Sequence, residues 1–334
     1  MNRRTLGHGL AALLTSHAAR RASAQEPEIL DVRKIWDAAP HNAFTDLIRH
    51  QDRWWCVFRE GDAHVSPNGA LRVLRSTDGK SWESTARVTS TTADLRDAKI
   101  SVTPSGELML SGAGALNPPT TIRHQSYAWF SKDGTTWSDP TPAGDPDLWL
   151  WRITWNRGIG YGFAYNTNPD RPKRFLKFYS TPDGRRYDTV IERLTPDLSP
   201  GEHALSFQPD GSVVCLLRRD VEGAGALIGT ARPPYTDWTW KNTGTKIGGP
   251  ALLRLPDGRI LGAVRLLRPR IKTSLVWIDP VAGTLTPFLD LPSGGDTSYA
   301  GLVWHENQLC MSYYSTHEGK TSIYFARVRI PLKT

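Results

Sequence analysis

Short runs of apolar residues, each long enough for one β-strand and bounded by turn residues, follow one another along most of the chain. They recur from about residue 44 to residue 330, and no helical period of useful length appears after residue 25. Turn signals separate the runs at regular intervals. The pattern predicts an all-β fold made of many short antiparallel strands.

One turn signal returns several times along the chain. It has the form S-x-D-G-x-x-W at residues 76–82, recurs at residues 131–137, and appears more loosely at residues 180–187. An Asp-Gly pair makes a tight hairpin because Gly accepts positive φ and the Asp side chain binds nearby backbone amides. A repeat of about 50 residues indicates one supersecondary unit used several times. We expect the aromatic residue to pack under each turn, and the turns to lie away from the chemistry.

The strand-like runs fall into six groups, of which five contain four strands and the last contains three. The predicted strands are residues 44–48, 54–59, 71–75 and 82–88; 99–103, 107–112, 127–130 and the segment after 137; 151–155, 160–165, 175–179 and 187–193; 204–208, 212–218, 226–231 and 238–241; 251–255, 259–265, 273–278 and 284–289; and 299–305, 308–314 and 322–330.

A further run at residues 29–36 has no partner nearby in the sequence. It can supply the fourth strand of the last group, which joins the two ends of the chain and removes a free sheet edge. The sequence therefore predicts a six-bladed β-propeller of four-stranded antiparallel blades, closed by the N-terminal strand. The predicted propeller is a single domain over residues 25–334.

The amino-acid composition agrees with this fold and limits the classes of binding partner that we expect. The 334 residues include 13 Trp, 29 Gly and 24 Pro, which suits many strands joined by tight turns. The formal net charge of +8 favours acidic partners in general. Because the basic residues form no Lys/Arg run, nucleic acid is not a predicted partner. Three widely spaced cysteines without a C-x-x-C pair predict buried thiols, and no metal or cofactor is predicted.

The first 24 residues have the pattern of an export signal. Arg3 and Arg4 precede a modest apolar run at residues 6–14, and residues 22–24 form a small-x-small cleavage site. The paired arginines suggest the twin-arginine route. No stretch is long enough to span a membrane. We therefore expect a periplasmic or secreted protein.

A second repeat locates the candidate chemistry. Counting back eight residues from the turns between the first and second strands reaches positions where each innermost strand begins, at one mouth of the ring. These positions are Asp97, Trp149, Glu202 and Gly249, with Tyr299 and Phe44 as approximate equivalents. Counting forward eight residues reaches the ends of the second strands at the same mouth, which are Ala113, Tyr165, Arg218 and Arg265, with Arg59 and Tyr313 or Tyr314 as approximate equivalents.

The turns resemble the Asp boxes of sialidases, which are six-bladed propellers, although here Asp and Gly are adjacent rather than separated by one residue. Residues 202–211 followed by Arg218 resemble the family segment with a Glu before a strand and an arginine closing the next one. Residues 298–302 resemble the segment that carries the nucleophilic tyrosine, with Ala300 and Gly301 in place of the usual Ser-Asp. The resemblance covers roughly residues 44–330.

The resemblance implies a division of roles among these residues. A sialoside carries a carboxylate on its anomeric carbon, and sialidases use tyrosine as the nucleophile in place of a carboxylate. Tyr299 would attack and Glu202 would take its proton. Guanidinium groups would bind the substrate carboxylate, for which Arg218, Arg59, and either Arg265 or Arg270 are candidates. Asp97 matches an aspartate that binds the sugar ring.

Two departures from the family pattern leave alternatives open. The Arg-Ile-Pro motif expected at the start of the first blade is replaced by residues 43–47, which contain no arginine. The loop expected to hold the acid/base aspartate, residues 60–69, contains both Asp62 and His64. A histidine there suits general acid or base catalysis near neutral pH.

Three functions are therefore compatible with the sequence. The first is a secreted exo-glycosidase of sialidase type acting on an acidic oligosaccharide or glycoconjugate. The second is another carbohydrate-active propeller enzyme, such as a uronate lyase or a rhamnosidase-like hydrolase that uses His64. The third is a non-catalytic propeller that binds glycans or serves as a scaffold.

Overall fold

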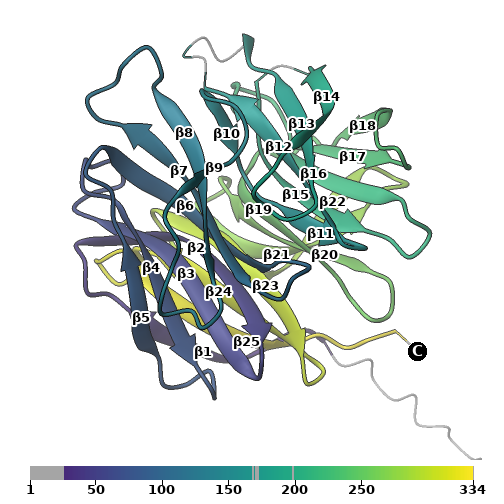
Figure 1. Cartoon of the computed structure of the whole chain (residues 1–334). Coiled ribbons are helices and arrows are strands. Elements are labelled where there is room, and N and C mark those ends of the chain that lie inside the picture. The colour runs from purple at the N-terminus through teal and green to yellow at the C-terminus, as the bar shows by residue number, and fades with distance from the viewer. Residues whose placement is uncertain (1–25, 168, 170–172, 198, 334) are drawn as a thin grey trace, which may run out of the picture.

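The computed structural model describes residues 26–167, 169, 173–197 and 199–333. The predicted export signal, residues 1–24, lies outside this part of the chain. The described residues form six antiparallel sheets and no α-helix, and the sheets are arranged as the blades of a ring (Figure 1). The prediction of a six-bladed β-propeller is confirmed.

The first three blades run from the innermost to the outermost strand in chain order. Blade 1 consists of β2 (His41–His50), β3 (Arg53–Gly61), β4 (Ala70–Ser76) and β5 (Glu83–Val88). Blade 2 consists of β6 (Ala93–Val102), β7 (Leu108–Leu116), β8 (His124–Ser131) and β9 (Thr141–Pro142). Blade 3 consists of β10 (Leu148–Leu150) and β11 (Thr154–Asn156), then β12 (Ile159–Asn166), β13 (Leu176–Thr181) and β14 (Asp188–Leu194).

The last three blades follow the same plan. Blade 4 consists of β15 (Pro200–Phe207), β16 (Val213–Arg219), β17 (Leu227–Ala231) and β18 (Trp238–Asn242). Blade 5 consists of β19 (Ile247–Arg254), β20 (Ile260–Leu266), β21 (Lys272–Asp279) and β22 (Thr284–Asp290). Blade 6 consists of β23 (Thr297–His305), β24 (Gln308–Ser315), β25 (Ser322–Arg329) and the N-terminal strand β1 (Glu28–Trp36).

The N-terminal strand closes the ring as predicted. β1 pairs antiparallel with β25, from Glu28 opposite Arg329 to Trp36 opposite Ile323. Figure 1 shows the purple β1 beside the yellow β25. The pairing turns two chain ends into one blade, so β25 has no unpaired edge along this stretch.

The innermost strand of blade 3 differs from the prediction of a single strand at 151–155. Two short strands, β10 and β11, pair with β12 on either side of residues 151–153. Elsewhere the inner strands begin earlier than predicted. β6, for example, starts at Ala93 rather than at residue 99, because a bulge interrupts the pattern of its side chains.

The hydrophobic core lies between neighbouring blades. One cluster joins Trp55 and Leu71 of blade 1 to Leu95 and Trp129 of blade 2, and equivalent clusters join the other blades. The cysteines at positions 56, 215 and 310 are free and buried, as predicted. No helix among the described residues is long and apolar enough to cross a membrane.

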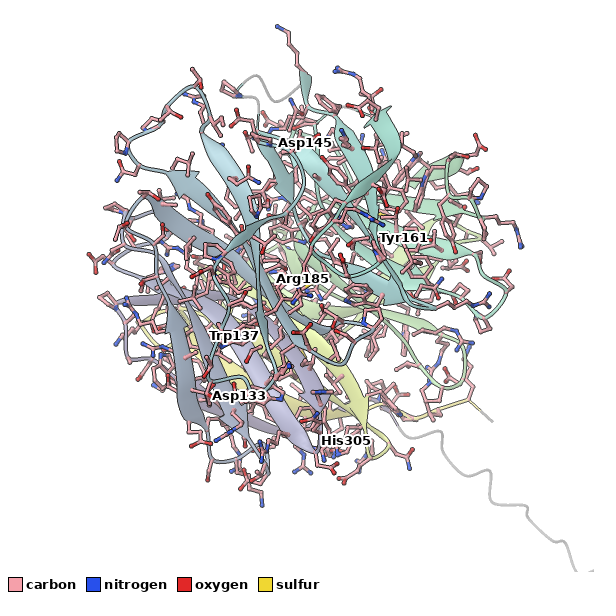
Figure 2. The ribbon with its side chains drawn as sticks, viewed as in Figure 1. Asp133, Trp137, Asp145, Tyr161, Arg185 and His305 are labelled. Atoms are coloured by element: carbon pink, nitrogen blue, oxygen red, sulfur yellow. The ribbon has the colours of Figure 1, made fainter. Side chains whose placement is uncertain are left out.

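The Asp-Gly turns of blades 1, 2 and 3 pack against the preceding blade of the ring, because a Cβ at Gly79, Gly134 or Gly184 would meet the side chain of Phe325, Trp55 or Met109. Hydrogen bonds within each turn fix its shape. The Ser76 hydroxyl accepts a hydrogen bond from the Gly79 amide at 2.9 Å, and Asp78 Oδ1 accepts one from the Lys80 amide at 2.7 Å. The same bonds recur in the other two turns. Figure 2 places Asp133 and Trp137 close together at the end of the blades where His305 also lies. That end is opposite to the end at which β23 begins.

Substitution of Gly134 by Ala is predicted to destabilise the propeller more than the same substitution at Gly106. Both glycines have positive φ, at 73° and 84°. A Cβ at Gly134 would lie 2.1 Å from the Trp55 ring, whereas a Cβ at Gly106 would meet nothing within 4 Å. We expect the free energy of unfolding in urea to fall by about 2–4 kcal/mol for Gly134→Ala and by about 1 kcal/mol for Gly106→Ala. Equal losses would show that the turn does not depend on its contact with the preceding blade.

Candidate active site

A β-bulge recurs in the innermost strands at the mouth of the ring. In five blades, two residues of the inner strand lie opposite one residue of the second strand. The bulged pairs are residues 44–45, 97–98, 201–202, 249–250 and 299–300. Bulges re-aim side chains and are frequent beside active sites.

The first residue of four of these bulges has a left-handed backbone. The φ angles are 62° at Phe44, 55° at Asp97, 53° at Gly249 and 51° at Tyr299. Such a conformation is costly for residues other than glycine, and it persists where the surrounding structure holds it. The positions counted from the turn repeats are therefore the places where the strands bend, with two exceptions. Glu202 is the second residue of its bulge, and Trp149 lies in a regularly paired strand.

A cavity of about 330 Å³ opens at this mouth. Its described lining contains four arginines and three carboxylates together with aromatic, histidine and threonine side chains. The lining residues are Phe44, His64, Arg96, Asp97, His124, Trp149, Tyr165, Thr167, Arg174, Glu202, Arg218, Asp220, Arg265 and Tyr299. The excess of guanidinium groups over carboxylates suits a ligand that carries negative charge.

Tyr299, Glu202 and Arg218 form a closed triangle of hydrogen bonds. The Tyr299 hydroxyl donates to Glu202 Oε1 at 2.7 Å. Arg218 Nη1 donates to the same carboxylate oxygen at 2.5 Å and to the Tyr299 hydroxyl at 2.8 Å. The other oxygen of Glu202 accepts the Gly249 amide at 2.8 Å. These bonds join the inner strands of blades 4, 5 and 6.

Electrostatics fixes the resting protonation of this triangle. Burial works against the charge of Glu202, but Arg218 and the hydrogen bonds from Tyr299 and the Gly249 amide outweigh it and lower its pKa. Burial and the negative charge of Glu202 raise the pKa of Tyr299, while Arg218 and Arg265 oppose that rise. The resting site therefore holds an ionised Glu202 and a neutral Tyr299.

The Tyr299 ring is held on several sides. It makes edge contacts with Phe44 and Trp151, with ring centroids 5.1 Å and 5.8 Å away. The Arg265 guanidinium lies 5.0 Å from the ring centroid. A Cβ at position 249 would lie 2.6 Å from the ring, so glycine is required where the strand passes the tyrosine.

Arg265 belongs to a second group of hydrogen bonds beside the triangle. Its Nη2 donates to Asp296 Oδ1 at 3.0 Å and to the Tyr314 hydroxyl at 2.7 Å, and its Nε donates to the Thr297 carbonyl at 2.7 Å. Tyr314 donates in turn to Asp296 Oδ1 at 2.7 Å. Burial opposes the charge of Asp296, but its hydrogen bonds and Arg265 hold its pKa well below the usual range.

Asp97 has the opposite protonation tendency to Glu202. Burial raises the pKa of Asp97 to about 6, although Lys99 works against the rise. Lys99, two residues further along β6, donates to the Ala98 carbonyl at 3.1 Å, and burial lowers its pKa to about 8. The cavity thus contains two carboxyl groups whose pKa values are pushed apart, a pattern found in acid/base catalysis.

The structure brings together most of the residues singled out from the sequence. Tyr299, Glu202, Arg218, Arg265, Asp97 and His64 all line the cavity. Asp62 and Arg270 are exposed, and the described cavity lining does not include them.

Arg59 must be reassigned, because its side chain is fully buried and does not line the cavity. Its Nη2 donates to Asp94 Oδ1 at 2.8 Å and to the Ser66 hydroxyl at 2.9 Å, and its Nη1 donates to the Ala63 carbonyl at 2.7 Å. The guanidinium therefore holds the β3–β4 loop, which carries His64, against blade 2.

Sequence reasoning missed His41 and Asp296, which lie next to the cavity. His41 begins β2, and Asp296 precedes β23. Ring closure was the signal that could have located them, because it makes the mouth ends of blades 1 and 6 adjacent. The sequence contains no motif that joins them.

Replacing Arg59 by Met is predicted to destabilise the fold rather than to weaken ligand binding. The change leaves Asp94 with one guanidinium partner fewer and frees the loop, so we expect a loss of about 3–5 kcal/mol in the free energy of unfolding in urea. Arg270→Met, at an exposed position, serves as the matched control and should leave stability nearly unchanged. Unchanged stability in Arg59→Met would contradict the structural role.

Comparisons with known proteins agree with this architecture. No protein-family model and no curated protein sequence matches the chain. Among solved structures, a Dyadobacter fermentans protein of unknown function has a TM-score of 0.80 at 19% identity, covering 91% of this chain and 99% of that protein. A Penicillium chrysogenum α-L-arabinanase, solved with arabinobiose, has a TM-score of 0.69 at 15% identity, covering 89% and 98%.

A Trypanosoma rangeli sialidase, solved with the inhibitor DANA, is also similar. Its TM-score is 0.65 at 11% identity, and the match covers 86% of this chain and 55% of that protein, so this chain spans about half the length of the sialidase. At these identities the likeness is one of fold. The chain shares its six-bladed propeller with glycoside hydrolases of more than one specificity.

Proposed function

We propose that the protein is an exo-glycosidase of sialidase type that removes an acidic sugar from a glycan. The observation that carries the proposal is the hydrogen bond from Tyr299 to Glu202, enclosed by Arg218 and Arg265. A phenol becomes a useful nucleophile only with a base beside it. The guanidinium-rich lining suits a sugar that carries a carboxylate.

The proposed reaction has two balanced steps. In the first, the Tyr299 oxygen bonds to the anomeric carbon while its proton passes to Glu202, and the bond to the leaving sugar oxygen breaks. Asp97 gives its proton to that oxygen. In the second step, water replaces tyrosine on the anomeric carbon, and the two carboxyl groups return to their starting protonation states.

Asp97 suits the role of general acid better than Asp62. It lines the cavity, and its pKa of about 6 leaves part of the population protonated near neutral pH. Asp62 is exposed outside the described lining. His64 lines the cavity as well, but its Nδ1 is already engaged with Asp296 at 2.7 Å.

A second candidate is a glycosidase for a neutral furanoside that uses Glu202 as nucleophile and Asp97 as acid. The divergent pKa values of the two carboxyl groups favour it. The fold shared with an α-L-arabinanase supports including arabinosides among the substrates tested. In this reaction Tyr299 serves only as a hydrogen-bond donor to Glu202.

Tyr299→Phe is predicted to separate the two candidates. We expect wild-type protein to release the fluorophore from an acidic glycoside, in a panel that includes a sialoside, uronides and an α-L-arabinofuranoside. The Phe variant should lose about three orders of magnitude or more in kcat, because the attacking oxygen is gone. Tyr187→Phe is the control, because this hydroxyl donates to the Gly184 carbonyl at 2.9 Å in a turn that does not line the described cavity.

Activity on the arabinofuranoside that largely survives in Tyr299→Phe would support the second candidate and reject tyrosine as nucleophile. An increase in ultraviolet absorbance from an unsaturated uronate would instead identify a lyase. Failure of the wild-type protein to turn over any member of the panel, with glycan binding retained, would favour a non-catalytic propeller.

The pH dependence of kcat/KM provides a separate test of Asp97. A general acid must be protonated, so the rate should fall as pH rises through about 6. Asp97→Asn should abolish that limb and slow release of a natural sugar leaving group by about 10²–10⁴-fold. An activated aryl glycoside needs less help from an acid and should be slowed less. An unchanged limb in the Asn variant would exclude Asp97 as the acid.

A further inference from the structure

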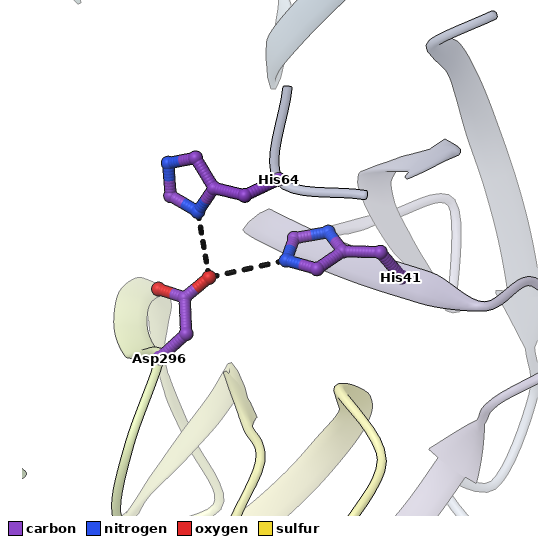
Figure 3. Close-up of side chains that lie close together, drawn as sticks. All are labelled: His41, His64 and Asp296. Carbon is purple, nitrogen blue, oxygen red and sulfur yellow. Dashed lines mark hydrogen bonds and ion pairs between the residues drawn. The ribbon is translucent and has the colours of Figure 1, made fainter. Parts of the chain in front are cut away.

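Three potential metal ligands from separate parts of the chain meet beside the cavity. His41 lies at the start of β2, His64 lies in the β3–β4 loop, and Asp296 lies just before β23. Figure 3 shows both imidazole rings directed at one carboxylate oxygen. His64 Nδ1 is 2.7 Å and His41 Nε2 is 3.1 Å from Asp296 Oδ2, and the three ligand atoms lie within 4.8 Å of one another.

These separations are close to those of a metal site. Bonds of about 2.0–2.2 Å in a tetrahedral site place neighbouring ligand atoms about 3.3 Å apart. The observed nitrogen–oxygen distances of 2.7 Å and 3.1 Å are shorter than that value, by about 0.6 Å and about 0.2 Å. Small rotations of the imidazole rings would make room for an ion where the two hydrogen bonds now lie.

The surroundings hold the carboxylate in the orientation that a ligand needs. Asp296 Oδ2 points at the two histidines, while Oδ1 accepts hydrogen bonds from Arg265 and Tyr314. Partners of this kind orient ligating carboxylates in metal sites. The His41 ring is buried and packs against the His64 ring, with centroids 5.5 Å apart, and the His64 ring packs edge-on against Phe44 at 5.0 Å. The ligands are therefore largely preorganised.

We propose that His41, His64 and Asp296 bind a divalent transition-metal ion, with Zn²⁺ the best fit to two imidazoles and one carboxylate. The ion would keep an open coordination position on the cavity side, because His64 lines the cavity and its side chain is 54% exposed. The sequence predicted no metal, since His64 and Asp296 are 232 residues apart.

A cation at this position would add to the positive charge of the cavity. Asp296 is the one carboxylate in the proposed ligand set, and it is already paired with Arg265. The ion would retain excess positive charge, so an anionic oxygen of a bound ligand would suit its open position. The inference does not depend on Tyr299 chemistry, and its test measures metal binding rather than turnover.

The experiment is a Zn²⁺ titration of the full chain by calorimetry after treatment with a chelator, followed by metal analysis of the dialysed protein. We expect saturation at one Zn²⁺ per chain in wild type and loss of that saturable binding in His64→Ala. Because the His64 side chain is exposed, we expect this variant to fold as wild type does. His305→Ala, at the far end of the blades, should bind as wild type does.

A substitution at Tyr314, which contacts the proposed ligand Asp296, tests whether the carboxylate must be oriented for metal binding. Tyr314→Phe removes one hydrogen bond from Asp296 Oδ1 and should weaken Zn²⁺ binding by about 10- to 100-fold. Visible absorption of a Co²⁺-substituted sample should show a four- or five-coordinate ion in wild type and not in His64→Ala. Absence of saturable Zn²⁺ binding in wild type, or equal binding in His64→Ala, would overturn the proposal and leave Asp296 as a hydrogen-bond partner that orients the imidazoles.

Discussion

Closure of the ring is the constraint on which the rest of this structure depends. The pairing of β1 with β25 places the first and last blades side by side, and buried polar bonds then secure their junction. Thr45 Oγ1 donates to the Tyr299 carbonyl at 2.8 Å, and Asn42 Nδ2 donates to the Thr321 carbonyl at 2.9 Å. Without closure, the bulge that bears Tyr299 would not contact blade 1, and the cavity would lose the side that Phe44 and His64 form.

The bulges in the inner strands direct side chains into the cavity at one end of this closed ring. Bulges leave backbone groups without ladder partners, and carboxylates from the preceding blade accept hydrogen bonds from amides at or near two of them. Asp46 accepts the Ile100 amide at 3.1 Å, and Glu202 accepts the Gly249 amide at 2.8 Å. The same contacts that hold neighbouring blades together therefore fix the direction of the residues in the cavity. Stability and site geometry have a common origin here.

Local sequence was enough to predict the blades and most of the mouth. The distance from turn to mouth is nearly constant in most blades, so a fixed count from the turns reached Asp97, Tyr299 to within one residue, and Arg218 near the end of β16. The count failed for Arg59, because its direction is set by Asp94 of another blade and not by its own strand. The convergence of His41 with Asp296 likewise depends on a junction between distant segments. The separation of pKa values between Glu202 and Asp97 depends on burial and charge contacts, which no spacing in the sequence records.

Arg218 and Arg265 both contact Tyr299, so their charges act on the tyrosine as well as on any bound ligand. Arg218 Nη1 contacts both the Tyr299 hydroxyl and Glu202 Oε1, so it stabilises negative charge on either oxygen. Moving the proton across the 2.7 Å bond between them shifts that charge from one arginine contact to another. Arg265, over the tyrosine ring, favours the phenolate further. In the proposed reaction, the buried phenol would thereby have a base and compensation for the charge that it develops, which is the electrostatic requirement of a tyrosine nucleophile.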